Sequence, residues 1–570
     1  MEEITDNNNI KQKKSNRFKI ILTVVITLMA LGIAAFAMYI APDYQKDESE
    51  DMINLIINNK NVTSKMKNEV YIDDNGVIYL SKDDVQNYFD KYIKYYEDDK
   101  RLVTTYEDKL AVLIGNNKTM EVNGTLENIK ASIISKNDIM YIPFSEMCEN
   151  VYNASLTYIS NEDSKIVIVD SKDREVKEAT TKKKISVKYK AKVLSRTLEK
   201  VDKGEKLIYI STNEGWAKVR TQNGKIGYIK ESNISEVTTT REARVETKSI
   251  EGKINLVWDY YSEYVTAPDR TGQTIEGVNV VSPSFFTLEK GTGNITENIG
   301  AEGIKYIEWA HENGYEVWAM FSNNSLRETT SSVISDFEKR QTLIDNIVEL
   351  VEIYDIDGLN LDFENLNLSD KSNYSRLVIE LAPRLKALGK TFSVDVTAPD
   401  GSENWSLCFD RNVIGHVADY IVFMAYDQYG NGTKAGTTAG YNWVETNINK
   451  FIDQEVVKSE KIILGIPLYT RIWTITDDET KDSSKTVDIK DVDRVIKGKG
   501  EKQWNDTLKQ YYIEYEENGQ KRAMWIEDEK SIIEKIGLAN KYKLAGIAFW
   551  EKDREQEGLW KIVDEELNKE

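Results

Sequence analysis

Three polar side chains alternate with apolar ones in the segment DGLNLDFEN, residues 357–365. Successive side chains of a β-strand point to opposite faces, so Asn360, Asp362 and Glu364 would share one face. Burying two carboxylates and an amide on one face is costly unless they have a use. Their mutual repulsion and partial desolvation predict a raised pKa for at least one carboxylate. A general acid at neutral pH requires such a pKa.

Histidine and cysteine are too scarce for several other kinds of catalytic site. The chain has two of each: His311, His416, Cys148 and Cys408. These numbers exclude a disulfide framework and a four-thiolate zinc site, and they disfavour Ser-His-Asp, Cys-His and histidine-rich metal sites. We therefore expect no metal and no cofactor, and we expect carboxylates and tyrosines to carry the chemistry.

The overall charge bears on the class of partner. The formal net charge is -20 at pH 7, and the sequence pI is about 4.9. Nucleic-acid binding needs a basic surface that replaces the counterions of the phosphates. The composition therefore predicts no nucleic-acid partner.

The elements that would position Asp362 and Glu364 follow from the pattern between residue 250 and the end of the chain. Apolar runs alternate there with stretches of helical period, and each run is continuously apolar, as in strands buried on both faces. Eight such repeats predict a (β/α)8 TIM barrel with its active site at the carboxyl ends of the strands. The predicted strands are 253–259, 277–286, 315–322, 356–365, 391–400, 418–427, 461–469 and 544–551. The long gap before the last strand predicts an α+β insertion at about 476–526.

The segment 357–364 resembles the D-G-x-D-x-D-x-E signature of glycoside hydrolase family 18, which includes chitinases and bacterial wall-lytic N-acetylglucosaminidases. The resemblance covers the whole predicted barrel. It extends to MAYD at 424–427, GIPLYTRIW at 465–473 and GIAFWEKD at 546–553. The ending YKLAGIAFW is similar to that of spore- and wall-associated members.

The resemblance implies a role for each matching residue. Glu364 would protonate the glycosidic oxygen, Asp362 would hold the 2-acetamido group and share a proton with Glu364, and Tyr426 would bind the acetamido carbonyl. The substrate's own acetamido oxygen would attack the anomeric carbon, so the product would retain its configuration without an enzyme nucleophile. The implied substrate-binding residues are Trp550, as the aromatic floor under the sugar, and Asp427, Met424 and Asn360.

Asn360 departs from the signature, which has Asp at this position. An amide removes one negative charge beside Asp362. We therefore expect lower pKa values for the Asp362–Glu364 pair and a shifted pH optimum, with the acid itself kept in place.

The N-terminal residues bear on the compartment. Residues 20–40 are apolar and uncharged, long enough to cross about 30 Å of hydrocarbon. Basic residues in 1–19 precede the run and acidic ones follow it, which predicts a cytoplasmic tail and extracytoplasmic C-terminal domains. We interpret the run as a single-pass anchor in the cell membrane. The alternative is a cleaved signal peptide, with Ala35-Phe36-Ala37 as its cleavage site.

Two accessory domains are expected between the anchor and the barrel, so the chain is multidomain. Residues 43–68 are predicted to be a spacer. Residues 69–172 predict a small α+β domain that resembles the N-terminal domain of copper amine oxidases, although it contains no histidine and thus no copper ligands of that type. After a basic, Thr-rich linker, residues 184–236 resemble a bacterial SH3 domain, an SH3-like β-barrel, through Trp216 and the Gly227-Tyr228-Ile229 run.

Together these features predict hydrolysis of β-1,4 glycosidic bonds after N-acetylglucosamine (GlcNAc). The anchor, the SH3-like domain and the lack of a recognisable chitin-binding module favour peptidoglycan as the polymer. One alternative is a hydrolase of chitin or chitooligosaccharides. Another is a non-catalytic wall-binding lectin or surface adaptor, against which the joint presence of Asp362, Glu364, Tyr426 and Trp550 argues.

Overall fold

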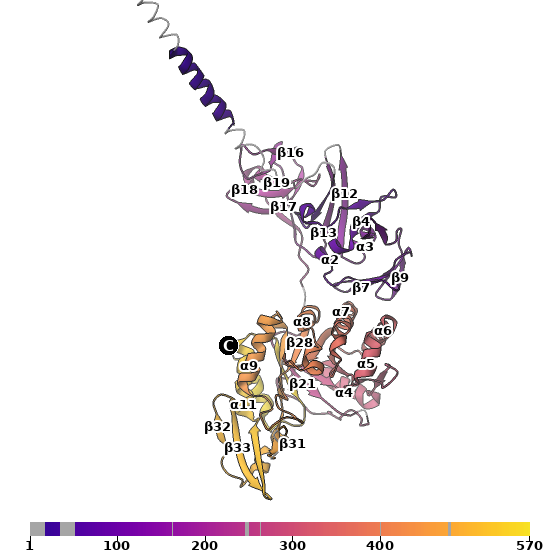
Figure 1. Cartoon of the computed structure of the whole chain (residues 1–570), viewed down its shortest axis with the longest axis vertical. Helices are drawn as coiled ribbons and strands as arrows, with labels where there is room; N and C mark the ends of the chain where they lie inside the picture. Colours follow the sequence, from indigo (N-terminus) through magenta and orange to yellow (C-terminus); the bar gives the residue numbers. More distant parts are fainter. Residues whose placement is uncertain are drawn as a thin grey trace, which may run out of the picture. The chain divides into compact units, whose positions relative to one another are not determined.

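The computed structural model describes residues 17–34, 52–161, 164–245, 250–262, 264–399, 401–476 and 480–569 (Figure 1). Its residues form two compact units. The first is built largely from residues up to Glu246 and the second largely from Thr247–Glu570. Most of the predicted cytoplasmic tail (1–16), the end of the predicted anchor (35–40) and the start of the predicted spacer (43–51) lie outside the described residues.

A separate helix covers Arg17–Ala34, so it begins before the apolar run predicted at 20–40. By length and composition it can cross a membrane. A membrane anchor and a signal sequence both meet this criterion.

Eight parallel strands close into a barrel in the second unit, and all eight predicted strands are confirmed. The ring runs β22-β21-β35-β29-β28-β27-β26-β25 and closes where Val280 of β22 pairs with Glu316 of β25. The strands are β21 (Ile254–Asp259), β22 (Val280–Pro283), β25 (Glu316–Ser322), β26 (Gly358–Asp362), β27 (Thr391–Val396), β28 (Tyr420–Met424), β29 (Ile462–Pro467) and β35 (Gly546–Trp550). A short hairpin, β23 (Phe286–Leu288) and β24 (Ile295–Glu297), extends the sheet beside β25.

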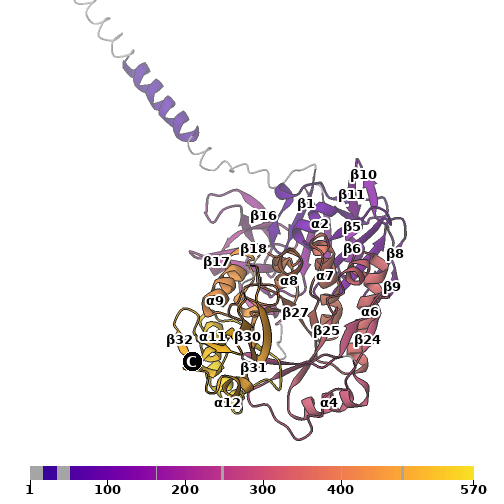
Figure 2. The same ribbon diagram turned by 60° about the horizontal axis from the view of Figure 1, so that its bottom comes forward.

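Helices pack around these strands (Figure 2). They are α4 (Gly300–Glu312), α5 (Arg327–Ile334), α6 (Phe337–Ile353), α7 (Lys371–Ala387), α8 (Arg411–Val417), α9 (Tyr441–Asn449), α11 (Glu529–Lys541) and α12 (Leu559–Leu567). In α6 the buried Leu343, Ile344, Ile347 and Val351 recur at helical spacing, so one face packs on the strands. The Asp336 side chain caps its first turn by accepting from the Lys339 amide.

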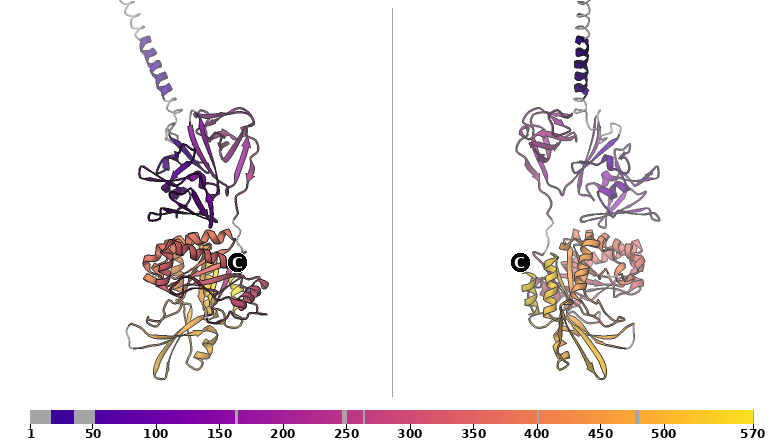
Figure 3. Two further views of the ribbon diagram at one scale, coloured as in Figure 1. Left: turned by 90° about the vertical axis from the view of Figure 1, so that its right-hand side faces the viewer. Right: turned by 60° about the vertical axis from the view of Figure 1, so that its left-hand side comes forward.

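The insertion is a five-stranded antiparallel sheet of order β31-β30-β34-β33-β32. Its strands are β30 (Tyr469–Thr474), β31 (Ser483–Asp488), β32 (Gln503–Asn505), β33 (Gln510–Glu517) and β34 (Gln520–Ile526), with the short helix α10 (Val492–Ile496). Figure 3 shows this sheet projecting from the ring of helices. It starts at Tyr469, earlier than the predicted 476, because the apolar run GIPLYTRIW contains two strands that belong to different sheets.

The prediction of a spacer at 43–68 is wrong for its described part. Residues Ile53–Ile57 (INLII) form β1, which pairs in parallel with β13 (Ser164–Ser171) and antiparallel with β2 (Lys60–Asn61). Polar flanks mask this short apolar strand in the sequence, but burial of Leu55 and Ile56 against β13 fixes it in the sheet. The accessory domain therefore begins in the segment predicted as a spacer.

This α+β region contains three small sheets, of which the β1 sheet is one. β12 (Ala154–Asn161) completes the β1 sheet, and a second sheet has the order β10-β11-β4-β3. The other bounds are β3 (Tyr71–Ile72), β4 (Ile78–Ser81), α2 (Lys82–Tyr88), β5 (Lys94–Tyr96), β6 (Arg101–Tyr106), β7 (Lys109–Ile114), β8 (Thr119–Val122), β9 (Thr125–Asn128), β10 (Ile134–Lys136), β11 (Ile139–Ile142) and α3 (Phe144–Met147). The resemblance to the amine oxidase domain stays a prediction.

The segment predicted as SH3-like forms a seven-stranded antiparallel sheet, β16-β15-β19-β18-β17-β14-β20. It is larger than the predicted range 184–236, because β14 lies in the segment expected to be a linker and β20 follows the range. The strands are β14 (Val176–Thr180), β15 (Ile185–Lys188), β16 (Thr197–Val201), β17 (Lys206–Asn213), β18 (Trp216–Arg220), β19 (Ile226–Lys230) and β20 (Thr238–Arg241). Its SH3-like identity stays a prediction.

Candidate active site

Strand β26 presents its polar and apolar side chains to opposite sides, as predicted from their alternation. Leu359, Leu361 and Phe363 are buried in the core shared with the helices. On the other face, Asn360 is bonded to residues of three other strands, β21, β22 and β27, inside the barrel. The strand ends at Asp362, so Glu364 lies just beyond its carboxyl end. This is the end of the barrel where a TIM-barrel active site is expected.

The backbone of Glu364 is held from the neighbouring strand by Asn323, which follows β25. The Glu364 amide donates to the Asn323 Oδ1 at 3.0 Å, and the Asn323 Nδ2 donates to the Glu364 carbonyl at 2.9 Å. The same Nδ2 also donates to the Thr330 hydroxyl. Sequence analysis missed Asn323, because its only local signal is an Asn- and Ser-rich stretch that is typical of a turn.

Both predicted catalytic carboxyls have raised pKa values. Burial, followed by the charges of Asp362 and Asp427, raises the pKa of Glu364 to about 8. Burial, followed by the charge of Asp395, raises the pKa of Asp362 well above its usual range. The Asp362 Oδ1 is buried without a hydrogen-bond partner among the described residues. The prediction that at least one carboxylate has a raised pKa is confirmed, and Glu364 is suited to act as an acid at neutral pH.

The surroundings of Asn360 contradict the expectation that it binds the substrate. Its side chain is fully buried, with its Oδ1 accepting from the Trp258 indole at 2.8 Å and its Nδ2 donating to Asp395 at 2.6 Å, so it is not a substrate-contacting residue. The expectation that the amide lowers the pKa values of the pair, relative to an Asp at position 360, stays a prediction. Position 360 has an amide instead of a carboxyl, but Asp395, on β27, supplies a carboxyl beside it. Its sequence signal was a lone acid in the apolar run TFSVDV.

Tyr426 and Asp427 follow β28, whose last residue, Met424, is only 7% exposed. Burial and the nearby carboxyls raise the pKa of Tyr426 well above 10, so its hydroxyl keeps its proton. Asp427 has a φ of 55°, a conformation that a non-glycine residue rarely adopts. Its Oδ1 accepts from the Tyr469 hydroxyl and from Arg471, both at 2.7 Å.

Trp550 is the last residue of β35 and is partly exposed. Its ring lies 5.7 Å from that of the buried Trp258, edge to face, and 5.7 Å from that of Tyr260. Tyr260 is 47% exposed and was not singled out from the sequence. Two partly exposed aromatic rings side by side form a surface on which an apolar sugar face can stack.

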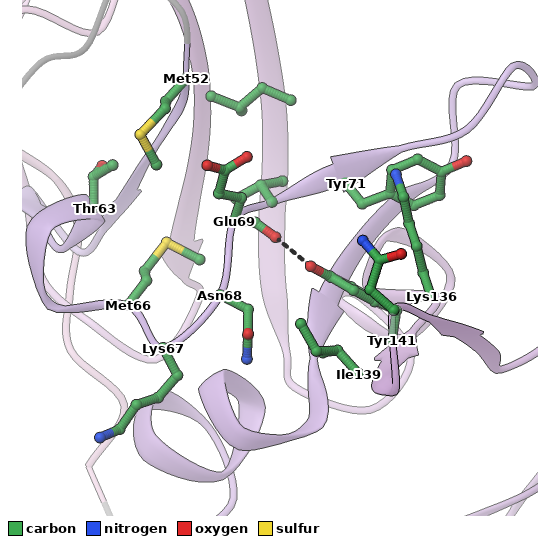
Figure 4. A pocket seen from close by; sticks show the side chains of 13 residues that line it. Met52, Thr63, Met66, Lys67, Asn68, Glu69, Tyr71, Lys136, Ile139 and Tyr141 are labelled. Carbon is green, nitrogen blue, oxygen red and sulfur yellow. Dashed lines mark hydrogen bonds between the residues drawn. The ribbon is translucent and has the colours of Figure 1, made fainter.

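A separate surface cavity of about 490 Å3 lies in the first unit (Figure 4). Among the residues that line the cavity, the Lys136 ammonium lies over the Tyr71 ring, 3.8 Å from its centre. The Tyr141 hydroxyl donates to the Glu69 carbonyl at 3.2 Å. A lysine engaged with an aromatic ring and a tyrosine bonded to backbone do not form an acid–base pair, so the catalytic chemistry is assigned to the barrel.

Several known proteins are similar to this chain. The protein is similar to the uncharacterized glycosylase YvbX of Bacillus subtilis (strain 168), with 27% identity over 50% of this chain and 84% of that protein. It is 23% identical to the cortical fragment-lytic enzyme of Bacillus anthracis, over 43% of this chain and 57% of that protein. The crystal structure of the spore cortex-lytic enzyme SleL of Bacillus megaterium QM B1551 aligns with a TM-score of 0.48 and 19% identity, covering 64% of this chain and 89% of that one.

The family comparison covers the whole barrel and its insertion. Residues 256–555, more than half of the chain, match the family described as glycosyl hydrolases family 18. The matched range includes Asp362, Glu364, Tyr426 and Trp550, which the structure places at or just beyond the carboxyl ends of barrel strands. The chain is a glycosidase that belongs to glycosyl hydrolase family 18.

Proposed function

We propose that the enzyme cleaves β-1,4 bonds after GlcNAc by a retaining, substrate-assisted mechanism. The observation that carries the proposal is Glu364, a carboxyl with a pKa of about 8 beside Asp362 at the end of β26. Glu364 gives its proton to the glycosidic oxygen as the bond to the anomeric carbon breaks. The acetamido oxygen of the same sugar bonds to that carbon, and water later opens the resulting ring with Glu364 as the base.

Asp362 and Tyr426 are proposed to orient the acetamido group. Asp362 would accept from its N–H, and the Tyr426 hydroxyl, kept protonated by its raised pKa, would donate to its carbonyl oxygen. The Asp362 interaction strengthens as positive charge develops on the acetamido group, so it favours the transition state over the bound substrate. The Tyr426 bond would orient the carbonyl oxygen toward the anomeric carbon before it attacks.

Asp427 is the carboxylate that would replace this mechanism if it acted as a nucleophile. A retaining enzyme with its own nucleophile needs two carboxyls about 5 Å apart on opposite sides of the anomeric carbon. Asp362 and Glu364 come from one strand and the residues just beyond it, so we expect both to lie on the same side of the sugar rather than on opposite sides. The Asp427 Oδ1 is paired with Arg471 and bonded to Tyr469, which lowers its nucleophilicity. We therefore assign Asp427 to substrate binding.

Peptidoglycan is the polymer we favour. The cortical fragment-lytic enzyme named above acts on a wall fragment by its name, and the N-terminal helix can hold a catalytic unit at the cell surface. We propose that this helix is an uncleaved anchor, with the units that follow outside the membrane. The same acetamido chemistry would act on chitin, which is the alternative polymer.

The test is digestion of purified peptidoglycan and of chitooligosaccharides in parallel, with mass spectrometry of the new reducing ends. A reducing-end GlcNAc from peptidoglycan supports the proposal, and release from chitin alone would change the polymer. A thiazoline analogue of GlcNAc should inhibit, and de-N-acetylated substrate should be inert. Comparable hydrolysis of the free-amine substrate, or a glycosyl ester trapped on Asp427, would contradict the mechanism.

A further inference from the structure

The acid site contains a third carboxyl that comes from the neighbouring strand. Asp395 lies on β27 and is 2% exposed. The register of the parallel pair sets Leu361 beside Val394, so the next step along the two strands brings Asp395 beside Asp362. Asp395, Asp362 and Glu364 therefore form one buried group of carboxyls at the carboxyl ends of β26 and β27.

Hydrogen bonding distinguishes the two innermost carboxyls of this group. The Asp395 Oδ1 accepts from the Asn360 Nδ2 at 2.6 Å, and a hydrogen bond donated to a carboxylate favours its charged form. The Asn360 amide is itself fixed by the Trp258 indole and the Ser393 hydroxyl. The Asp362 Oδ1, by contrast, is buried and has no hydrogen-bond partner in the part of the chain that the structure describes.

We propose that Asp395 is a positioning residue of the acid site, which carries the negative charge of the buried group and thereby retains protons on Asp362 and Glu364. In this view, Asn360 is more than the replacement of an acid on β26. Its amide is the hydrogen-bond donor that keeps the negative charge on Asp395 of β27. This inference rests on the proposed role of Glu364.

All three carboxyls of the group have raised pKa values, and the Asn360 bond is what sets Asp395 apart from Asp362. Burial and the charge of Glu364 raise its pKa, while the Asn360 bond opposes them, and the rise at Asp362 comes from burial and the charge of Asp395 without such an opposing bond. The other titratable groups facing it are Tyr374 of α7 and Tyr426 after β28, whose hydroxyls keep their protons. Three like charges this close cannot all ionise together, so the best-bonded one ionises first.

The test compares the pH dependence of kcat for the parent enzyme, Asp395→Asn and Asn360→Asp/Asp395→Asn on a chromogenic chitooligosaccharide. The amide oxygen introduced by Asp395→Asn would still accept from Asn360, so the fold and KM should be kept. Loss of the adjacent charge should shift the alkaline limb of the pH profile, where kcat falls as pH rises, to a pH lower by about 1 unit or more. The double variant puts a carboxyl back at position 360 and should return the limb toward that of the parent.

An alkaline limb that does not move in Asp395→Asn, with unchanged kcat, would overturn the inference and leave Asp395 as a structural residue. Glu364→Gln separates this outcome from failure of the proposed function. If Glu364→Gln is inactive and the limb of Asp395→Asn does not move, only the inference fails. If Glu364→Gln stays active, the proposed function fails first. The pH dependence of the Tm of the same variants gives a second readout. If Asp395 has this role, unfolding of Asp395→Asn should be linked to fewer protons than unfolding of the parent.

Discussion

The Asn323 side chain binds both backbone groups of Glu364, accepting from its amide at 3.0 Å and donating to its carbonyl at 2.9 Å. One amide thus connects the end of β25 to the second residue beyond β26 and replaces the ladder bonds that the strand no longer provides. The side chain proposed as the acid is thus set on a fixed backbone although it lies outside regular structure. Such support of a reacting group from neighbouring residues is what precise geometry requires.

Asn323→Ala should lower kcat by about 10- to 100-fold with little change in KM. Two partly buried backbone groups would lose their partner, at a cost of up to about 1–3 kcal/mol each, and Glu364 would lose its fixed position. Thr330→Val, which removes only the group that orients the amide, should have a smaller effect. Steady-state kinetics with circular dichroism spectra would check this, and equal effects of both substitutions on kcat would argue against the clamp.

Glu364→Gln should lower kcat by about 10²- to 10⁴-fold, the usual contribution of a general acid. The substitution is nearly isosteric, so substrate affinity and fold should be kept. The matched control is Glu352→Gln, because Glu352 is exposed at the end of α6. Release of reducing ends measures activity, and a Glu364→Gln enzyme within tenfold of the parent would show that Glu364 is not the acid.

The pKa of Glu364 predicts an alkaline limit to activity at about pH 8, because the acid must be protonated. The sign for stability follows from the same shift. The folded-state pKa lies above the usual value of about 4.3, so the associated stability is full below that pH and is lost as pH rises through about 8. Glu364→Gln should therefore raise the Tm near pH 8 but not near pH 4. A Tm difference that is constant across this range would contradict the shift.

Trp550→Ala should raise KM by about tenfold or more, because loss of a stacking surface worth about 1.4 kcal/mol has that effect. Trp550→Phe keeps an aromatic face, so its KM should lie between the KM values of the parent and of Trp550→Ala. Binding of a chitooligosaccharide to the Glu364→Gln background, measured by calorimetry, separates affinity from catalysis. Equal affinities for Ala and Trp at position 550 would place the sugar elsewhere.

The full chain should sediment with membranes, and deletion of residues 17–34 should release an active soluble enzyme. The helix Arg17–Ala34 can span the hydrocarbon core, and the basic residues before it favour an inside N-terminus. Protease added to wall-stripped cells should remove the catalytic unit. A soluble form with its N-terminus just after Ala37 would instead show that the segment is a cleaved signal peptide.

Local pattern sufficed for the features whose signal lies within one segment. Burial on both faces requires continuous apolar runs, so the eight barrel strands could be located, and the two-residue period placed Asp362 and Asn360 on one face. The same reasoning failed for β1, since four apolar residues and one Asn between polar flanks become a strand only when β13, more than a hundred positions later, pairs with them.

Tertiary structure alone decided which residues surround Glu364. Asn323 and Asp395 come from β25 and β27, and nothing within either segment indicates that closing a barrel brings both beside the end of β26. The pKa values depend on that convergence, because burial and like charge act through space and not along the chain. The sequence by itself therefore predicted Glu364 as the acid and located the strand that ends just before it, and barrel closure decided the proton affinity of Glu364 and the support of its backbone.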